Sequence, residues 1–248
     1  MKNLFAITLI LFIGLTACKK EAGPIPSNQT NPKLFPTNAK VMCLGDSRVE
    51  GGRPLYESYR YELWKNLKDK GRTFDFIGVQ VDDTSYPTYN GESFDTDHFG
   101  FGGEKTKGLY KKVKKEIKGD LVPNIVFLCI GGNDMLEYRS IDKAIENINK
   151  TIDYLKLCNP NVVIFIEQIA PGKTEIMTDE FVSNINDFNN KVGELATQQT
   201  SGNQYVIAVD MYSNWNDNLM ADDVHYNELG AKEVADRYQS AMDTFFEN

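Results

Sequence analysis

The sequence predicts a three-layer α/β/α domain built on a five-stranded parallel sheet. The first observation behind this prediction is that, from residue 40 onward, short apolar runs alternate with longer segments whose apolar residues recur at helical spacing. The second is that the short runs are apolar throughout, as in strands that helices cover on both faces. The third is a length of 248 residues, which is enough for one domain with a sizeable core.

Each element follows from these patterns. The predicted strands are residues 40–45, 74–79, 124–130, 162–167 and 205–210. The predicted helices are residues 58–70, 103–118, 141–157, 178–199 and 227–246. The third helix has the clearest pattern, because one helical face collects Ile141, Ile145, Ile148, Ile152 and Leu155. Five strands separated by helices fit a flavodoxin-like sheet, and the sequence contains no internal repeat and no second domain.

The amino terminus is predicted to be a signal sequence over residues 1–17. Lys2 precedes an apolar run over residues 4–15. As a helix this run spans about 18 Å, which is short of the roughly 30 Å hydrocarbon core of a membrane. A signal sequence therefore fits better than a transmembrane helix.

A lipid anchor is expected at Cys18. Leu15-Thr16-Ala17-Cys18 resembles the lipobox of bacterial lipoproteins, in which the cysteine is acylated. Residues 18–39 carry four prolines among small polar residues and predict a semi-extended tether, with residues 40–248 as the folded domain. We expect an extracytoplasmic protein anchored to a bacterial membrane; the alternative is a plain secretory signal with a chance cysteine.

Composition excludes several classes of partner. The formal net charge of −8 argues against nucleic acid and anionic lipid head groups, so membrane association should come from the lipid alone. With His98 and His225 as the only histidines and no Cys/His cluster, no metal site is expected. Cys43 and Cys129 lie in apolar runs and are predicted to be buried free thiols, although a disulfide between them stays possible.

Polar motifs follow the predicted strands. Gly45-Asp46-Ser47 follows the first strand, Gly131-Gly132-Asn133-Asp134 follows the third, and residues 211–226 follow the last. Residues 80–103 form a long polar loop after the second strand, and loops of this length are usually functional. Because the carboxyl ends of parallel strands meet at one edge of the sheet, these motifs should share one cleft.

Three residues are suited to acyl transfer by a serine nucleophile. Ser47 directly follows a strand, where its hydroxyl would stand at the sheet edge; the alternative is an ordinary turn or cap serine. Asp222 lies three residues before His225, so one turn brings its carboxylate under the imidazole, fixing the tautomer. Asp223 competes in principle, but in a tight turn its side chain points away.

Two further groups are suited to stabilising an oxyanion. Asn133 follows a glycine pair at the end of a buried strand, and its amide is a neutral donor. The alternative is a turn with Asn and Asp as turn formers. Gly103 would offer its backbone N–H, although Gly100 and Gly102 are close enough in the sequence to leave the choice of glycine open.

The ordered set Gly-Asp-Ser, Gly, Gly-x-Asn-Asp and Asp-x-x-His resembles the SGNH (GDSL) hydrolase family from residue 40 to the end. The resemblance implies Ser47 as nucleophile, with His225 and Asp222 completing the triad. It also implies an oxyanion hole formed by the amide of Ser47, Gly103 and Asn133.

A narrower similarity is to the carbohydrate acetylesterase branch, which includes acetylxylan esterases. It is carried by residues 58–64, 74–78 and 95–103. Arg48-Val49 stands where that branch usually has Ile-Thr, and Glu104-Lys105-Thr106 stands where Trp-Thr is common. These departures touch the edge of the pocket and therefore concern the substrate more than the chemistry.

Other polar and aromatic residues are assigned structural roles. Arg60 is expected to pair with a carboxylate rather than clamp a substrate, and His98 to hydrogen-bond rather than act as a second base. Aromatic side chains in the loops could stack on sugar rings, but packing is the favoured role for each one. They are Tyr86, Tyr89, Phe94, Phe99, Phe101 and Trp215.

The function expected from these features is hydrolysis of small acyl esters, with acetyl preferred, on a carbohydrate, through an acyl-enzyme and without a cofactor. One alternative is a lysophospholipase, thioesterase or general lipase on the same scaffold. The other is a catalytically idle glycan-binding lipoprotein.

Overall fold

The computed structural model describes residues 33–247. The predicted signal sequence and Cys18 lie outside the described residues, and so does most of the predicted tether. Within the described part, Phe35 already packs edge-on against Phe246, with ring centroids 5.4 Å apart. The chain therefore contacts the domain before the first strand begins.

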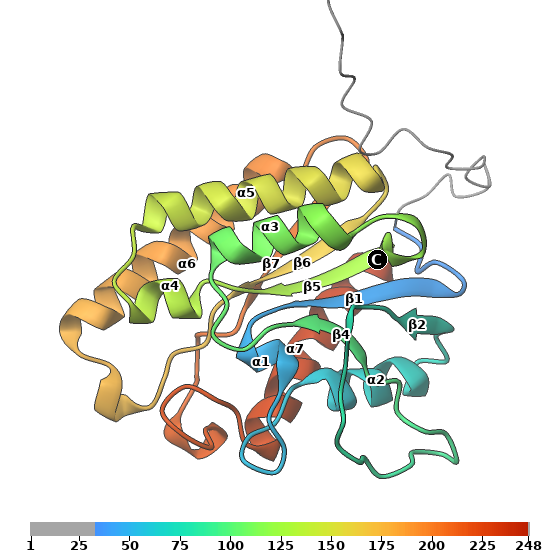
Figure 1. Cartoon of the computed structure of the whole chain (residues 1–248), viewed down its shortest axis with the longest axis horizontal. Helices are drawn as coiled ribbons and strands as arrows, with labels where there is room; N and C mark the ends of the chain where they lie inside the picture. The colour runs from blue at the N-terminus through green and yellow to red at the C-terminus, as the bar shows by residue number, and fades with distance from the viewer. Residues whose placement is uncertain (1–32, 248) are drawn as a thin grey trace, which may run out of the picture.

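A parallel sheet forms the middle layer (Figure 1). All five predicted strands form and run parallel in the order β2-β1-β5-β6-β7. They are β1 (Ala39–Gly45), β2 (Phe74–Phe76), β5 (Ile125–Cys129), β6 (Val163–Gln168) and β7 (Tyr205–Asp210). This is the flavodoxin-like strand order, so the predicted fold class is confirmed.

Two short strands extend the sheet within the segment that the sequence predicted to be a loop. β4 (Asp97–Gly100) pairs in parallel with the carboxyl end of β1, and β3 (Gln80–Val81) pairs antiparallel with β4. The prediction missed them because the segment is polar and glycine-rich. Phe99, which is fully buried, is the apolar side chain that fixes β4 against the core.

Five long helices cover the two faces of the sheet (Figure 1). One face packs against α2 (Arg60–Asp69) and α7 (Glu228–Phe246). The other packs against α3 (Thr106–Glu116), α5 (Ile141–Cys158) and α6 (Asp179–Gln199). Side chains of β1 alternate between the two cores, since Val41 and Cys43 face α2 and α7 while Met42 and Leu44 face the opposite layer.

The sequence did not predict several short elements that lie between the long helices and strands. These are the single-turn helices α1 (Ser47–Glu50) and α4 (Gly132–Leu136) and the 3₁₀ turns η1 (Gly119–Leu121), η2 (Thr174–Ile176) and η3 (Asp217–Leu219). One turn is too short to show helical periodicity. Two of these elements nevertheless carry motifs that the sequence singled out, since Ser47 lies in α1 and Asn133 in α4.

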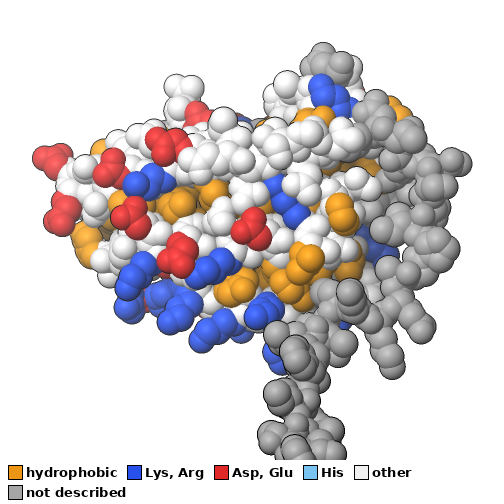
Figure 2. All heavy atoms as spheres, turned by 90° about the horizontal axis from the view of Figure 1, so that it is seen from above, with side chains coloured by type: hydrophobic (Ala, Val, Ile, Leu, Met, Phe, Trp, Pro, Cys, Tyr) orange, Lys and Arg blue, Asp and Glu red, His pale blue; other side chains and the backbone are white. Residues whose placement is uncertain are grey.

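Charge is unevenly spread over the surface. α3 buries Thr106, Leu109 and Val113 and carries five lysines among its eleven residues. On the face that Figure 2 shows, Lys and Arg side chains gather along the lower edge, while acidic side chains lie above them and at the left end.

Among residues 33–247, no helix is long and apolar enough to span a membrane.

Candidate active site

Ser47 is the first residue of α1, directly after β1. The turn is fixed by Asp46, whose carboxylate caps the helix by accepting the amide of Arg48 at 3.1 Å. The amide of Asp46 in turn donates to the carbonyl of Cys129 at the end of β5. Asp46 is buried while Ser47 is half-buried. The motif thus uses its aspartate to hold the turn and directs its serine toward the cleft.

His225 and Asp222 come together with Ser47. The imidazole Nε2 lies 2.9 Å from the Ser47 hydroxyl, and Nδ1 lies 2.8 Å from an oxygen of the Asp222 carboxylate. Burial alone would raise the pKa of Asp222, but the amides of Val224 and His225 and the imidazole hold that pKa below its usual value. Asp222 therefore stays ionised beside the ring.

Asp223 does not contact the imidazole. It is exposed, and its backbone carbonyl accepts the amide of Lys173 at 2.9 Å. Of the two carboxylates, that of Asp222 is the one beside the ring.

Asn133 reaches the same cleft from α4. Gly131, which precedes this helix, has φ +118°, and a Cβ there would lie 2.2 Å from the ring of Phe188, so only glycine fits. The amide nitrogen of Asn133 donates one hydrogen to the carbonyl of Glu104 at 3.0 Å. A carboxamide has two N–H donors, so a second one remains for a ligand.

Asp134, the neighbour of Asn133, has a structural role. Its carboxylate is buried and accepts both the amide and the hydroxyl of Thr106, at 2.9 and 3.0 Å. This contact holds the start of α3, and with it the glycine segment that precedes the helix, against α4.

The three glycines before α3 differ in their surroundings. The amide of Gly100 donates to Nδ1 of His98 at 3.0 Å, and the amide of Gly102 faces the carboxylate of Glu50. Gly103 is exposed, and a Cβ built on it would meet nothing within 4 Å. The first two amides are therefore occupied, which favours Gly103 as the donor to a bound ligand.

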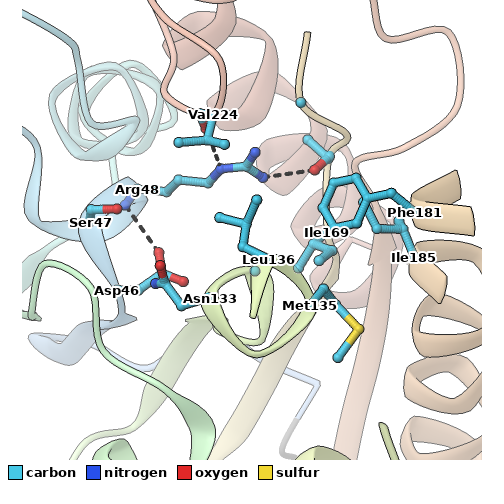
Figure 3. A pocket seen from close by; sticks show the side chains of 13 residues that line it. Asp46, Ser47, Arg48, Asn133, Met135, Leu136, Ile169, Phe181, Ile185 and Val224 are labelled. Carbon is cyan, nitrogen blue, oxygen red and sulfur yellow. Dashed lines mark hydrogen bonds between the residues drawn. The ribbon is translucent and has the colours of Figure 1, made fainter. Parts of the chain in front are cut away.

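A small cavity of about 30 Å³ opens beside Ser47 (Figure 3). Asp46, Ser47 and Asn133 lie on one side of it. Its other walls are mostly apolar and come from α4, from the loop after β6 and from the start of α6. They include Met135, Leu136, Ile169, Phe181 and Ile185.

Two residues at the site were not assigned a role from the sequence. Tyr56 stacks on the imidazole of His225, with ring centroids 3.9 Å apart and an interplanar angle of 17°. Gly52 makes room for it, because a Cβ there would lie 2.4 Å from the tyrosine ring. The second is Arg48, whose side chain crosses the top of the cavity (Figure 3). The stacking of Tyr56 could not be predicted from the sequence, because no local pattern connects Tyr56 to a histidine 169 positions later.

The other candidate residues occupy structural positions. Arg60 is fully buried and pairs with Asp82 at 2.8 Å, as expected. His98 is buried, and its Nδ1 accepts the Gly100 amide. Burial, followed by the nearby Arg60 charge, lowers the pKa of His98 to about 3, so its ring stays neutral.

The loop aromatics pack against one another and against the core, in line with the packing role favoured for each. Tyr86 and Phe94 contact Tyr61 of α2, and Phe99 contacts Phe101. Tyr89 contacts Trp64, and Trp215 lies against Tyr226.

Cys43 and Cys129 are buried free thiols, as expected. In the described part of the chain, no group of three or more His, Cys, Asp and Glu side chains is arranged to hold a metal ion.

Several solved structures share the fold of this chain. A carbohydrate esterase of family 3 from Talaromyces cellulolyticus matches with a TM-score of 0.69 at 24% identity, over 84% of this chain and 98% of that one. A family 3 carbohydrate esterase from Clostridium thermocellum matches with a TM-score of 0.69 at 24% identity, over 84% and 97%. An acetyl xylan esterase matches with a TM-score of 0.61 at 23% identity, over 82% and 98%.

At these identities the structural matches show the fold. No curated protein matches the chain. The model of the GDSL-like lipase/acylhydrolase family matches residues 43–233, which include the motifs at Ser47, Gly103, Asn133 and His225. The chain belongs to this family and is a carboxylic ester hydrolase.

Proposed function

We propose that this esterase removes small acyl groups, preferably acetyl, from a carbohydrate, with Ser47 as nucleophile, His225 as general base and Asp222 as the orienting carboxylate. The observation that carries the proposal is the continuous hydrogen-bonded chain from Asp222 through His225 to Ser47, with contacts of 2.8 and 2.9 Å, beside a small apolar cavity. This is the arrangement that acyl transfer by a serine hydroxyl requires.

The reaction proceeds in two halves. Nε2 of His225 accepts the Ser47 proton as Oγ attacks the ester carbonyl, and the carbonyl electron pair moves onto oxygen. The amides of Ser47 and Gly103 and the remaining N–H of Asn133 stabilise this oxyanion. The oxyanion then collapses, the bond to the sugar oxygen breaks, and His225 gives its proton to that oxygen.

Hydrolysis of the acyl-enzyme repeats these steps with water. His225 accepts a proton from water as the water oxygen attacks the acyl-enzyme carbonyl. The second oxyanion collapses with cleavage of the bond to Oγ, and His225 returns the proton to Ser47. Asp222 remains ionised throughout and stabilises the imidazolium that forms twice.

The size of the cavity supports a short acyl group. The cavity beside Ser47 is small and mostly apolar, and a pocket already filled by a short acyl group disfavours extra methylenes. The carbohydrate part of the proposal is supported by the resemblance of several sequence segments to acetylesterases. It is also supported by the printed functions of the structural neighbours, which include carbohydrate esterases and an acetyl xylan esterase.

The test uses 4-nitrophenyl esters of two to twelve carbons, acetylated xylan and a fluorophosphonate label, on the wild type and on Ser47→Ala. We expect labelling at Ser47, a maximum of kcat/KM at the acetyl ester, and release of acetate from the polysaccharide. A maximum at eight or more carbons would favour a lysophospholipase or thioesterase. Absence of both labelling and turnover would indicate an idle binding protein.

We further propose that lipid on Cys18 anchors the enzyme on the extracytoplasmic side of a bacterial membrane. The support is the Leu-Thr-Ala-Cys motif after an apolar run. Metabolic labelling with a fatty acid should mark the wild type and be lost in Cys18→Ser, while the specific activity stays unchanged. Equal labelling of both proteins would exclude this anchor.

A further inference from the structure

Arg48 is a buried cation that the serine mechanism does not use. It follows Ser47 on α1, and its side chain is 7% exposed. Its guanidinium carbon lies 4.9 Å from the ring centre of Tyr226. A buried guanidinium is costly unless its donors and its charge are satisfied, so its partners show what it holds together.

The donors of Arg48 reach two loops that are distant in sequence. Nε donates to the carbonyl of Val224 at 2.8 Å (Figure 3), and the terminal nitrogens donate to the carbonyls of Ala170 at 2.8 Å and of Pro171 at 3.3 Å. The loop after β6 and the loop after β7 are therefore both attached to the helix turn that carries Ser47.

Val224 is held from both sides. Its amide donates to the Asp222 carboxylate at 2.9 Å, while its carbonyl accepts from Arg48 at 2.8 Å. Val224 lies between Asp222 and His225 in the sequence, so Arg48 fixes the backbone on which both side chains stand. One residue thereby connects the turn that carries the nucleophile to the loop that carries the base.

The same side chain forms part of the wall of the small cavity. Arg48 lines the cavity together with its partners Ala170 and Val224 (Figure 3). The acetylesterase branch that this chain resembles usually has Ile at this position. An isoleucine is shorter and donates no hydrogen bond, so it could neither link the two loops nor close the same space.

We propose that Arg48 is a positioning and specificity-determining residue, which sets the register of the His225 loop against Ser47 and limits the cavity to short acyl groups. The inference rests on the proposed serine mechanism. Arg48 acts through His225 and through the shape of the pocket, and it takes no part in proton transfer.

Two effects follow when Arg48 is replaced. Without the contact to Val224, the imidazole loses its fixed place relative to Ser47, and misplacement of about 1 Å can lower a rate on the order of a hundredfold. Without the guanidinium wall, the cavity lengthens and longer acyl chains gain access. The first effect lowers kcat, whereas the second changes the preference between substrates.

The experiment compares four variants with 4-nitrophenyl acetate and butyrate: Arg48→Met, Arg48→Ile, Arg48→Lys and Lys156→Met. Lys156 is a matched control, because it is a buried cation that bonds Gln199. It lies near the end of α5, shortly before β6 begins, whereas Ser47 follows the carboxyl end of β1. Circular dichroism and thermal unfolding establish the folded fraction of each variant.

In Arg48→Met we expect kcat for acetate to fall about tenfold or more, with KM changed less than about threefold. In Arg48→Ile the ratio of butyrate to acetate kcat/KM should rise about tenfold. Arg48→Lys should retain more kcat than Arg48→Met, because it keeps one charged donor. Lys156→Met should lose stability while leaving kcat and the ester ratio unchanged.

A rescue experiment separates positioning from a general loss of folding. Arg48→Ala should regain activity at least about threefold in millimolar ethylguanidinium, with saturation, whereas ethylammonium at equal ionic strength should have no effect. The proposal is overturned if kcat of Arg48→Met stays within twofold of the wild type. It is also overturned if every loss follows the folded fraction, with an unchanged ester ratio and no rescue.

Failure of the serine mechanism would look different. In that case the wild type itself would show no fluorophosphonate label at Ser47 and no turnover of either ester. A labelled, active wild type with insensitive Arg48 variants would contradict the role of Arg48 alone.

Discussion

The two histidines lie near the same edge of the sheet in opposite surroundings. His225 stands in the loop after β7 with a side chain 19% exposed, between the carboxylate of Asp222 and the hydroxyl of Ser47. His98 is buried in β4, where its ring accepts an amide and lies near the guanidinium of Arg60. His225 thus contacts a carboxylate and a hydroxyl that can act with it in catalysis, whereas the Arg60 charge near His98 disfavours protonation of that ring.

The comparison extends to the groups around each ring. Near His225, Asn133 keeps an N–H that no described residue accepts, and Ser47 faces a cavity. Near His98, Arg60 donates to the carbonyls of Val49 and Glu50 and to the Asp82 carboxylate. Groups reserved for a ligand should therefore affect rate, and groups used within the protein should affect stability.

The largest expected effect on rate, after removal of Ser47 itself, is that of Asp222→Asn. The amide cannot stabilise the imidazolium and favours the wrong tautomer, so kcat should fall on the order of 10³- to 10⁴-fold. Asp223→Asn is the matched control and should keep full activity, because the contact that Asp223 makes with Lys173 uses its backbone carbonyl and not its side chain. Steady-state kinetics on 4-nitrophenyl acetate measures both. A greater loss in Asp223→Asn would reassign the carboxylate.

Asn133→Ala should come next. Its second N–H is expected to bond the oxyanion, which exists only beyond the ground state, so kcat should fall about a hundredfold while KM changes little. The contact to Glu104 is also lost, and thermal unfolding should show whether the fold has suffered. A loss confined to KM would mean that Asn133 binds substrate and does not stabilise the oxyanion.

Tyr56→Leu should have a smaller effect. The stacked ring holds one face of the imidazole, and aromatic pairs contribute about 0.5–1.5 kcal/mol beyond their buried area. We therefore expect kcat to fall roughly two- to tenfold. Tyr56→Phe keeps the ring and should behave as the wild type in the same assay. If Phe is as damaging as Leu, the hydroxyl matters and the stacking does not.

Much of the fold could be predicted from the sequence, because the hydrophobic periodicity of a long helix recurs over several turns. The pattern of α5 recurs over eighteen residues, whereas α1 and α4 have one turn each and show no period. The motifs at Ser47, Asn133 and His225 were recognisable since each is compact and follows a strand. The stacking of Tyr56 and the carbonyl partners of Arg48 were not, because they are set by contacts 122 to 176 residues apart.

His98→Asn should leave the rate almost unchanged and alter the stability at acid pH. In the folded protein, burial, with the Arg60 charge, lowers the pKa of His98 to about 3, against about 6.5 for a free imidazole. Between these values the unfolded chain binds a proton that the folded protein does not. The free energy of unfolding therefore falls as pH falls from 6.5 toward 3.

The asparagine keeps an oxygen that can accept the Gly100 amide but does not titrate in this range. Urea unfolding at pH 7 and pH 4.5 should show that the wild type loses roughly 2 to 3 kcal/mol relative to His98→Asn. Burial also raises the pKa of Asp46 to about 7, and its titration stabilises the folded protein as pH falls. Because Asp46 is present in both proteins, its contribution cancels in the difference. An equal pH dependence of the two proteins would show that His98 is protonated in the folded state, and the contrast between the two histidines would not hold.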